Sequence, residues 1–328
     1  MDDAGVLTEW AEGVFRRGAI SRGWLLLGED ALGAPLRLPL LVARGVAAGP
    51  LLGVTALVHG DELNGLGVIH RFFATLDAAR LRGTVVGVPV VNVPGFLDGR
   101  RVVAETFDLN RVMPGKEAGH TGEVYAFRLV RRLVRHFDCL IDLHTASRGR
   151  VNTHYVRADM RRATAAALAR RQNARIILHS VNGDANLRQA AMDLGVEAIT
   201  VEVGNPHVFQ PEMIAAGVVG LRNALVYLGM VEGAIVPAFS PATECAESVW
   251  LYTARGGILE VMPALGAWVK VDEPVATLRD VFGQVTQTIL APRAGIVIGK
   301  SINPVSPIGA RVIHLGVPQT KSPAEAGL

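Results

Sequence analysis

Apolar and polar residues are grouped along most of the chain in blocks that fit alternating strands and helices. An apolar run over 51–58 predicts a buried strand, and apolar residues then recur at helical spacing over 62–76. Similar blocks predict further strands over 84–92, 138–143, 151–156, 175–179 and 196–203, and helices over 121–136, 159–172, 186–194 and 212–228. This alternation favours an α/β fold with a mostly parallel sheet covered by helices on both faces.

The pattern changes on either side of this block and once within it. Residues 1–50 contain two short candidate strands, and the stretch 93–120 is rich in Gly, Pro and charge without a clear period. A loop of this length inside a compact domain is usually functional. From residue 235, short apolar alternations broken by Gly and Pro predict a small all-β, barrel-sandwich-like unit. We therefore expect a main domain that carries the chemistry over 1–232, a small β domain over 233–318 and a flexible tail over 319–328.

Composition narrows the class of protein. Half of the 328 residues are hydrophobic, which is enough to bury a sizeable core. The net charge of +3 is mild and the arginines are spread over predicted helix faces, which argues against a nucleic-acid partner. Two cysteines, Cys139 and Cys245, supply neither a disulfide framework nor a cysteine-based metal site. No apolar stretch reaches about 18 residues and no signal-peptide pattern opens the chain, so we expect a cytoplasmic protein without a membrane partner.

Candidate metal ligands stand where predicted strands end. His59 and Glu62 follow the strand over 51–58, and His144 follows the strand over 138–143. Parallel strands would bring all three to the same edge of the sheet, which is where open α/β sheets bind ligands. A lone His at a strand end is more often a hydrogen-bonded surface residue, but two such histidines with a Glu favour zinc. Two His and one Glu leave a coordination position open, as catalytic zinc requires.

Hydrolysis at such a metal needs a group that takes a proton from water and returns it to the leaving group. Glu202 is the best candidate, because it is a lone carboxylate near the carboxyl end of the strand over 196–203. The alternative is an ion-paired Glu at the sheet edge. Glu197 is a poorer candidate, because it begins the same strand at the opposite end.

Three residues of the long loop, Arg101, Asn110 and Arg111, are candidates for binding the substrate. A guanidinium can pair with a carboxylate through two hydrogen bonds or stabilise negative charge on a tetrahedral intermediate. Arg188 opens a predicted helix near the same edge and could hold a second anionic group. The ordinary interpretation of each arginine is a surface residue. The remaining histidines are interpreted as loop, strand or core residues: His70, His120, His136, His154, His179, His207 and His314.

Taken in order, the motifs resemble those of a known family. They are His-Gly-Asp-Glu at 59–62, Asn-Val-Pro-Gly-Phe at 92–96 leading to Gly-Arg-Arg at 99–101, Asp-Leu-Asn-Arg at 108–111, Asp-Leu-His at 142–144 and Val-Glu-Val-Gly at 201–204. The chain resembles the succinylglutamate desuccinylase/aspartoacylase family of the zinc carboxypeptidase clan. Its length and the Gly-Asp-Glu motif resemble the N-acetyl-diaminobutyrate deacetylase branch.

This resemblance implies a carboxypeptidase-like α/β/α domain, one zinc ion and hydrolysis of a small N-acyl amino acid. It also implies a role for each candidate: ligands His59, Glu62 and His144, base Glu202, carbonyl-polarising Arg101, and carboxylate-binding Asn110 and Arg111. Two extra residues separate Arg101 from the Asp-Leu-Asn-Arg motif, compared with aspartoacylases. The segment 205–209 also lacks their Pro-rich continuation, which puts aspartoacylase activity itself in doubt.

The sequence is compatible with other functions. A zinc carboxypeptidase acting on short peptides would use the same chemistry and differ in the depth of its pocket. A non-catalytic metal- or ligand-binding protein would be expected to lack the base, whereas Glu202 is present. The segment 255–280 resembles the hairpins of lipoyl and biotinyl carriers but has no Lys at the hairpin tip. The sequence also leaves open assembly into a homo-oligomer.

Overall fold

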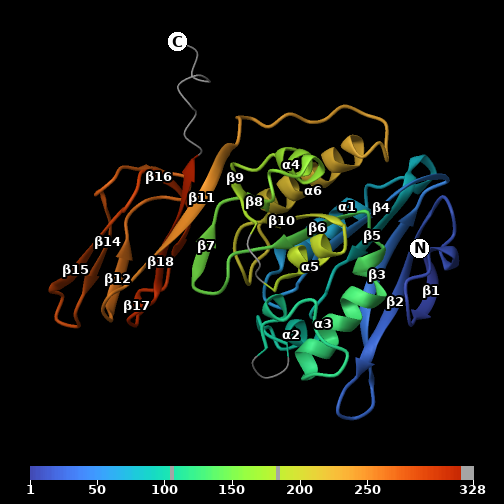
Figure 1. Cartoon of the computed structure of the whole chain (residues 1–328), viewed down its shortest axis with the longest axis horizontal. Helices are drawn as coiled ribbons and strands as arrows, with labels where there is room; N and C mark the ends of the chain where they lie inside the picture. Colours follow the sequence, from blue (N-terminus) through green and yellow to red (C-terminus); the bar gives the residue numbers. More distant parts are fainter. Residues whose placement is uncertain (104–106, 182–184, 319–328) are drawn as a thin grey trace.

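A computed structural model describes residues 1–103, 107–181 and 185–318 (Figure 1). The predicted tail at 319–328 lies outside these residues. One large mixed sheet runs through the molecule in the order β1-β2-β3-β5-β4-β6-β10-β8-β9-β11-β18-β16-β13, and β7 pairs with β16. Its first nine strands are β1 (Asp2–Leu7), β2 (Ala19–Glu29), β3 (Pro35–Arg44), β5 (Arg82–Val88), β4 (Ala47–Ala56), β6 (Cys139–His144), β10 (Glu197–Glu202), β8 (Tyr155–Ala158) and β9 (Ile176–His179).

The centre of this sheet confirms the predicted fold class. Strands β5, β4, β6 and β10 are mutually parallel neighbours. At the two ends of this block, β3 runs antiparallel to β5 and β8 runs antiparallel to β10. Parallel strands are buried on both faces, which explains why these strands appear in the sequence as continuous apolar runs.

Helices cover both faces of the sheet, as Figure 1 shows. One hydrophobic core contains side chains of α1 (Asn64–Phe73), α4 (Ala163–Arg170) and α6 (Pro211–Tyr227). A second core contains side chains of α3 (Thr121–Arg132) and α5 (Leu187–Asp193). A further short helix, α2 (Val93–Leu97), and a 3-10 turn over Leu109–Arg111 lie in the stretch that appeared aperiodic. The predicted α/β/α arrangement is therefore confirmed.

Three strand boundaries differ from the sequence pattern, each for a physical reason. β5 ends at Val88 because Pro89 follows and has no N–H for the ladder. β4 ends at Ala56, and Leu57 has a φ of +56°, which turns the chain out of the strand before His59. The single strand predicted over 151–156 is two strands, β7 (Arg150–Asn152) and β8, which pair with different partners.

The C-terminal region is all β, as predicted. Four of its strands extend the large sheet: β11 (Thr243–Tyr252), β18 (Arg311–Pro318), β16 (Gly295–Ser301) and β13 (Trp268–Val269). A separate antiparallel sheet contains β15 (Val285–Leu290), β14 (Pro274–Arg279), β12 (Gly257–Val261) and β17 (Val305–Ser306). The two sheets enclose their own hydrophobic core. A domain boundary near residue 232 is consistent with this core and stays a prediction.

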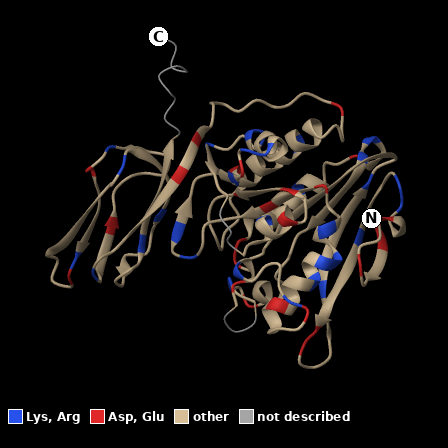
Figure 2. Ribbon diagram, viewed as in Figure 1, with Lys and Arg blue, Asp and Glu red and all other residues tan. Residues whose placement is uncertain are grey.

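Two backbone ladders join the C-terminal region to the rest of the molecule. β11 pairs in parallel with β9, and β7 pairs antiparallel with β16. A small hydrophobic cluster with members from both regions lies at this junction, including Tyr155 and Ile298. Figure 2 shows Lys and Arg positions interspersed with Asp and Glu positions over both regions. Among the described residues, no helix is long and apolar enough to cross a membrane.

Candidate active site

His59, Glu62 and His144 come together at the carboxyl ends of two neighbouring parallel strands, β4 and β6. All three side chains are buried, and one potential ligand atom from each lies within 4.8 Å of the others. Nδ1 of His59 lies 2.8 Å from Oε1 of Glu62, and Nδ1 of His144 lies 3.0 Å from Oε2. The structure thus gathers the three residues that the sequence predicted as metal ligands.

The turn that carries His59 and Glu62 depends on Gly60. A Cβ atom at this position would lie 2.0 Å from the carbonyl carbon of Gly95, which belongs to the short helix α2. Only glycine permits this approach of the two backbones. The Gly in the His-Gly-Asp-Glu motif therefore has a packing role, since it lets the loop after β4 lie against α2.

Each of the two histidines has a carboxylate next to its other ring nitrogen. Nε2 of His144 lies 2.7 Å from Oδ2 of Asp142, and Nε2 of His59 lies 3.1 Å from Oδ1 of Asp108. Thr55 holds Asp142 in turn, because its hydroxyl donates a hydrogen bond of 2.7 Å to Oδ1. A carboxylate acceptor places the ring proton on Nε2 and leaves the lone pair of Nδ1 facing Glu62. This is the arrangement by which proteins orient histidines that bind metals.

The donor set fits a divalent cation such as zinc. Nδ1 of His59 is buried without a hydrogen-bond partner among the described residues, although Glu62 is close. Burial lowers the pKa of His59, but the charge of Glu62 and the hydrogen bond to Asp108 hold it above its ordinary value. A cation would compete with a proton for the same nitrogen lone pair. Two imidazole nitrogens and one carboxylate match the catalytic zinc pattern that leaves one position open.

Glu202 is the last residue of β10 and stands directly opposite His144 in the parallel ladder. The side-chain amide of Asn152 donates to its Oε2 over 3.2 Å, and the hydroxyl of Tyr155 donates to Oε1 over 3.4 Å. Burial raises the pKa of Glu202 above its ordinary value, against the opposing charge of Arg157. A carboxylate with a raised pKa accepts a proton more readily, so its position and its environment both suit a general base.

Arg101 contacts the metal-ligand cluster directly. Its Nη1 donates to Oε1 of Glu62 over 3.1 Å and to the hydroxyl of Ser147 over 2.7 Å. Its Nε and Nη2 lie 3.1 and 3.0 Å from Oδ2 of Asp108. The side chain is 32% exposed, so the guanidinium can still be reached from the cavity. Arg101 is therefore held at the cluster by two carboxylates.

Asn110 and Arg111 lie on the 3-10 turn, which Asp108 caps by accepting a hydrogen bond from the Asn110 N–H. The side-chain oxygen of Asn110 accepts a hydrogen bond of 2.8 Å from the N–H of Leu187, so it connects this turn to the start of α5. Arg111 is exposed and lines the same cavity as the cluster. The long loop after β5 thus delivers several functional groups to one place.

Arg188 is buried on α5, where its guanidinium donates to the carbonyl oxygen and the hydroxyl of Ser180, over 2.8 and 3.1 Å. The sequence predicted that the helix N-terminus and Arg188 together could hold an anion. At that N-terminus, the N–H of Leu187 donates to Asn110 and the N–H of Gln189 donates to Asn186. Two of the N–H groups are therefore already used, and Arg188 is the part of this prediction that faces the cavity.

All the predicted site residues line a single cavity of about 450 Å³. The roles of Asp108 and Asp142 were not predicted, although these residues belong to the Asp-Leu-Asn-Arg and Asp-Leu-His motifs. The side of the cavity that the C-terminal region supplies was not predicted either; it consists of Ser248, Trp250, Arg311 and His314. No sequence signal marked these four, because their place depends on the pairing of β11 with β18.

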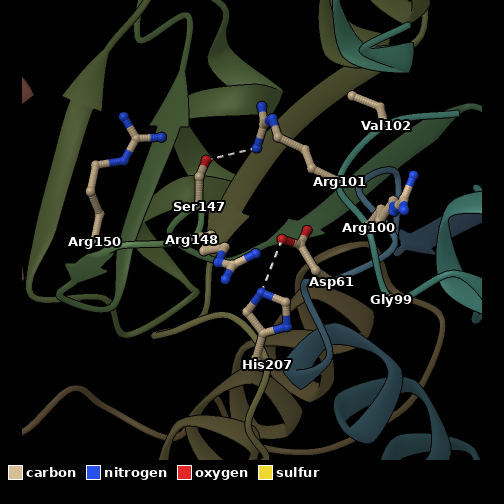
Figure 3. Close-up of a pocket in the computed structure, with 9 residues that line it drawn as sticks. All are labelled: Asp61, Gly99, Arg100, Arg101, Val102, Ser147, Arg148, Arg150 and His207. Atoms are coloured by element: carbon tan, nitrogen blue, oxygen red, sulfur yellow. Dashed lines mark hydrogen bonds and ion pairs between the residues drawn. The ribbon is translucent and has the colours of Figure 1, made fainter. Parts of the chain in front are cut away.

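A second cavity of about 470 Å³ adjoins the first and shares Arg101, Ser147 and Arg150 with it (Figure 3). Across it, Nε2 of His207 lies 3.4 Å from Oδ2 of Asp61, and the His207 N–H donates to the Asp61 carbonyl oxygen. His207 therefore contacts the residue beside Glu62 and lines this neighbouring space, while the described cluster is made by other residues.

The fold and the cavity together define an α/β/α protein of the carboxypeptidase-like type, with a His-Glu-His cluster that could hold a metal ion. Residues 48–228, more than half of the chain, match the succinylglutamate desuccinylase/aspartoacylase catalytic domain. The chain belongs to the succinylglutamate desuccinylase/aspartoacylase family, as its motifs indicated. The names of this family describe enzymes that remove an acyl group.

Individual relatives agree with this assignment. The chain is 28% identical to the N-alpha-acetyl-L-2,4-diaminobutyric acid deacetylase of Halomonas elongata, over 81% of this chain and 82% of that protein. Its fold is similar to the product-bound ectoine utilization protein EutE (DoeB) of Ruegeria pomeroyi, with a TM-score of 0.81, 26% identity and 90% and 93% of the two chains covered. A succinylglutamate desuccinylase/aspartoacylase of Rhodobacter sphaeroides shares the fold at a TM-score of 0.85 and 21% identity, over 95% and 100% of the chains.

Proposed function

We propose that this protein is a zinc-dependent hydrolase that cleaves the amide bond of a small N-acyl amino acid. One observation carries the proposal: His59, Glu62 and His144, with carboxylates behind both rings, share one cavity with Glu202. A binding protein would need the three ligands but not a carboxylate with a raised pKa beside them. This combination favours hydrolysis over simple metal binding.

In the proposed mechanism, one zinc ion per chain would be held by His59, Glu62 and His144. When bound, zinc supplies Lewis-acid chemistry, which makes water acidic near neutral pH and polarises a carbonyl group. Glu202 takes the proton from the attacking water and later gives it to the leaving nitrogen, which departs as an amine. The products are a carboxylic acid and a free amino acid.

The arginines and Asn110 have supporting roles in this proposal. Arg101 stabilises the negative charge that develops on the carbonyl oxygen, because it lies beside Glu62 and faces the cavity. Asn110 and Arg111 bind the α-carboxylate of the substrate. Arg188 presents a further positive charge from α5 on the same side. These groups hold the scissile bond in position for attack.

Small substrates are favoured over peptides, because the C-terminal region closes one side of the cavity with Trp250, Arg311 and His314. A cavity of about 450 Å³ suits an acyl amino acid and is at the low end for ligand pockets. The deacetylase of Halomonas elongata is named for such a substrate. A carboxypeptidase acting on short peptides is therefore the second candidate function.

The test is a hydrolysis screen with the purified protein, whose metal content is measured by mass spectrometry. The panel contains N-acetyl, N-succinyl and N-formyl amino acids and short peptides, each with and without a chelator. We expect release of amino acids from acyl compounds, loss of this activity with the chelator, and its return with zinc. Cleavage of peptides alone would favour the carboxypeptidase, and activity that is unaffected by metal removal would contradict the zinc mechanism.

Three predictions from the sequence stay predictions alongside this proposal. They are a location in the cytoplasm, a division of the chain into domains near residue 232, and the identity of the metal as zinc. The affinity order of divalent ions does not by itself select the metal that a protein holds in the cell. Metal analysis of protein from a native source addresses the last of them.

A further inference from the structure

The small antiparallel sheet of the C-terminal region ends in a strand that is paired on one side only. β15 is the first strand in the order β15-β14-β12-β17, and within the described part of the chain only β14 pairs with it. The backbone N–H and C=O groups on its other side therefore have no ladder partner. Figure 1 shows β15 at the outer end of the C-terminal region, away from the helices that cover the large sheet. A strand of another chain could reach this edge.

The other edge strands are protected against such pairing, whereas β15 is not. Among the described strands, β7, β13 and β17 are also paired on one side only, and they contain two or three residues each. β1 contains Asp2 and Asp3, which form ion pairs with Arg16 and Arg22. Short length and charge are two means by which proteins keep edge strands from pairing. β15 has six residues, Val-Thr-Gln-Thr-Ile-Leu, and contains neither a charged residue nor a proline.

The centre of β15 is regular, and its two ends present apolar side chains to solvent. Gln287, Thr288 and Ile289 pair with consecutive residues of β14, and the register shifts only toward the ends of the strand. The side chains of Val285 and Leu290, at these two ends, are 50% and 45% exposed. This edge therefore combines backbone groups that can form hydrogen bonds with apolar surface whose burial is favourable.

The sequence of β15 is complementary to itself in one antiparallel register. With a two-fold axis between Gln287 and Thr288, Val285 of one copy stands opposite Leu290 of the other, and this contact occurs twice. The exposed apolar side chains of the two strands would then meet, because directly opposed side chains in a ladder are neighbours. The two four-stranded sheets would become one continuous sheet.

The residues on either side of β15 are compatible with the same two-fold axis. The turn before the strand exposes Val281 by 82% and Phe282 by 88%. Val271, which is 55% exposed, lies at the other end of β15, because the N–H of the next residue, Asp272, donates to the carbonyl oxygen of Ala291. The axis brings the turn of one copy toward Val271 of the other. The apolar contact would therefore extend beyond the paired strands.

The same register brings unlike charges, not like charges, to each end of the contact. Arg279 is exposed opposite Val285, at the beginning of β15, and Asp272 is exposed near its end. Neither side chain lies in an ion pair with another described residue. The other carboxylate at the beginning of β15, Asp280, accepts hydrogen bonds from two N–H groups of the turn. Antiparallel pairing places the end with Arg279 beside the end with Asp272, which avoids repulsion.

We propose that two copies of this chain form a dimer through antiparallel pairing of their β15 strands. This inference goes beyond the proposed function and does not depend on it. The partner is a second copy because the apolar ends, the flanking turns and the charges all match across one two-fold axis. No residue of β15 lines either cavity, so both cavities stay accessible in the dimer. A pair of six-residue strands is smaller than a typical permanent interface, so dimerisation should depend on protein concentration.

The test measures the molar mass of the full-length protein by sedimentation velocity at low and high micromolar concentration. The wild-type protein should convert from monomer to dimer over this range. Val285→Lys and Leu290→Glu, made separately, should each raise the dimer Kd by at least about tenfold, because a charge would face an apolar side chain in the contact. Both side chains are about half exposed in the monomer, so the thermal unfolding curve should change little and shows that the variants fold. An unchanged Kd in both variants would overturn the proposal.

The double variant Val285→Lys/Leu290→Glu tests the register. In the proposed dimer, the introduced lysine of each copy stands opposite the introduced glutamate of the other, so the dimer should be restored in part. No other antiparallel register of β15 places these two positions opposite each other. A double variant that dimerises no better than the single variants would therefore overturn the proposal. Leu194→Lys is the matched control, because Leu194 is 51% exposed at the end of α5, outside the C-terminal region, and its Kd should equal that of the wild type.

Two further results would point to a different partner or a different surface, and each would overturn the proposal. A protein that stays monomeric at every concentration but co-sediments with phosphatidylglycerol vesicles would use the apolar turn at Val281 and Phe282 to bind a membrane surface. A dimer that persists in the single and double variants alike would be formed by another face of the molecule. Neither result bears on the proposed hydrolysis, because the measurement requires no substrate.

Discussion

The two sides of the cavity differ in how their charges are matched. On the side of the metal-ligand cluster, each ionisable group lies against an opposite charge or a hydrogen-bond partner: His144 against Asp142, His59 against Asp108, and Arg101 against Glu62. The other side, which we call the arginine–tryptophan wall, is formed by Arg150, Trp250, Arg311 and His314. There, Arg150 and Arg311 rest on the ring of Trp250, and no carboxylate oxygen of the described residues lies within 4 Å of them. Charges are therefore matched within the protein on one side, whereas two guanidinium groups stand without a carboxylate beside them on the other.

This difference indicates that the two sides of the cavity have different roles. Charges that are matched within the protein are held in fixed positions before the substrate arrives, which is what proton transfer and carbonyl polarisation require. Charges that are left unmatched favour a ligand that supplies the missing sign, and so they discriminate between substrates. We therefore expect changes on the cluster side to reduce the rate for every substrate, and changes on the wall to alter the ranking of substrates.

The largest effect should come from the base. Glu202→Gln removes the group that accepts the proton while keeping the shape of the side chain, so kcat should fall by about 10²–10⁴ for all substrates with metal content unchanged. Steady-state assays measure kcat, and metal analysis of the same samples measures the metal content. Glu197→Gln is the matched control. Glu197 begins the same strand, at the end opposite to Glu202, and pairs with Arg162 there. Undiminished turnover in Glu202→Gln would remove this residue as the base.

The carboxylates behind the histidines should have the next largest effect. Asp142→Asn weakens the orientation of the His144 ring, so zinc affinity should fall by about 10–100-fold. Competition with a chromophoric chelator measures this affinity. Asp138→Asn offers a comparison, because Asp138 lies just before the same strand and accepts a hydrogen bond from the N–H of Leu51. Equal zinc affinity in the two variants would show that the Asp142 contact does not orient the ligand.

Loss of the proposed contact with the substrate α-carboxylate should have a smaller effect on kcat/KM. Arg111→Ala should weaken kcat/KM for substrates with a free α-carboxylate by about 2 kcal/mol, near the low end for a charge pair, because Arg111 is exposed before substrate binds. Amides of the same acyl amino acids, which have no carboxylate, serve as the control and should lose little. An equal loss for both kinds of substrate would argue against this role.

The smallest effect expected is a change in pH dependence. Glu202 must be deprotonated to act as a base, so kcat/KM should rise with pH through a pKa above the ordinary value of a glutamate. Arg157 lowers this pKa by its charge, and Arg157→Gln should therefore move the acidic limb of the profile to higher pH. Arg162→Gln, near Glu197, provides the control. An acidic limb that stays at the same pH in Arg157→Gln would show that the charge of Arg157 does not control the pKa of Glu202.

The cluster side could be predicted from the sequence because it follows from strand order. His144 ends one apolar run and His59 directly follows another, over 51–58, so the rule that parallel strands share an edge was sufficient to place both together, although β4 itself ends at Ala56. Glu202 followed from the same rule. The helices over both faces were predicted because their apolar spacing is regular, as in α1 and α3.

The wall could not be predicted, for physical reasons. Trp250 and His314 are far apart in the chain and meet only because β11 and β18 pair in one particular register. A shift of a single residue would turn these side chains to opposite faces, and the sequence of this Gly- and Pro-rich region does not specify the register. His314 received an ordinary interpretation for this reason. The division of 151–156 into two strands escaped prediction in the same way, because it depends on a distant partner, β16.

The pairing of β7 with β16 has a consequence for attempts to exchange parts between relatives. Arg150 belongs to the N-terminal region by sequence, yet its backbone lies opposite Ser301 of the C-terminal region, next to the ring of Trp250. A chimera that grafts a foreign C-terminal half onto this chain would also have to supply a strand able to receive β7. Substrate preference would therefore transfer between relatives only when β7 and its partner strand β16 are exchanged together.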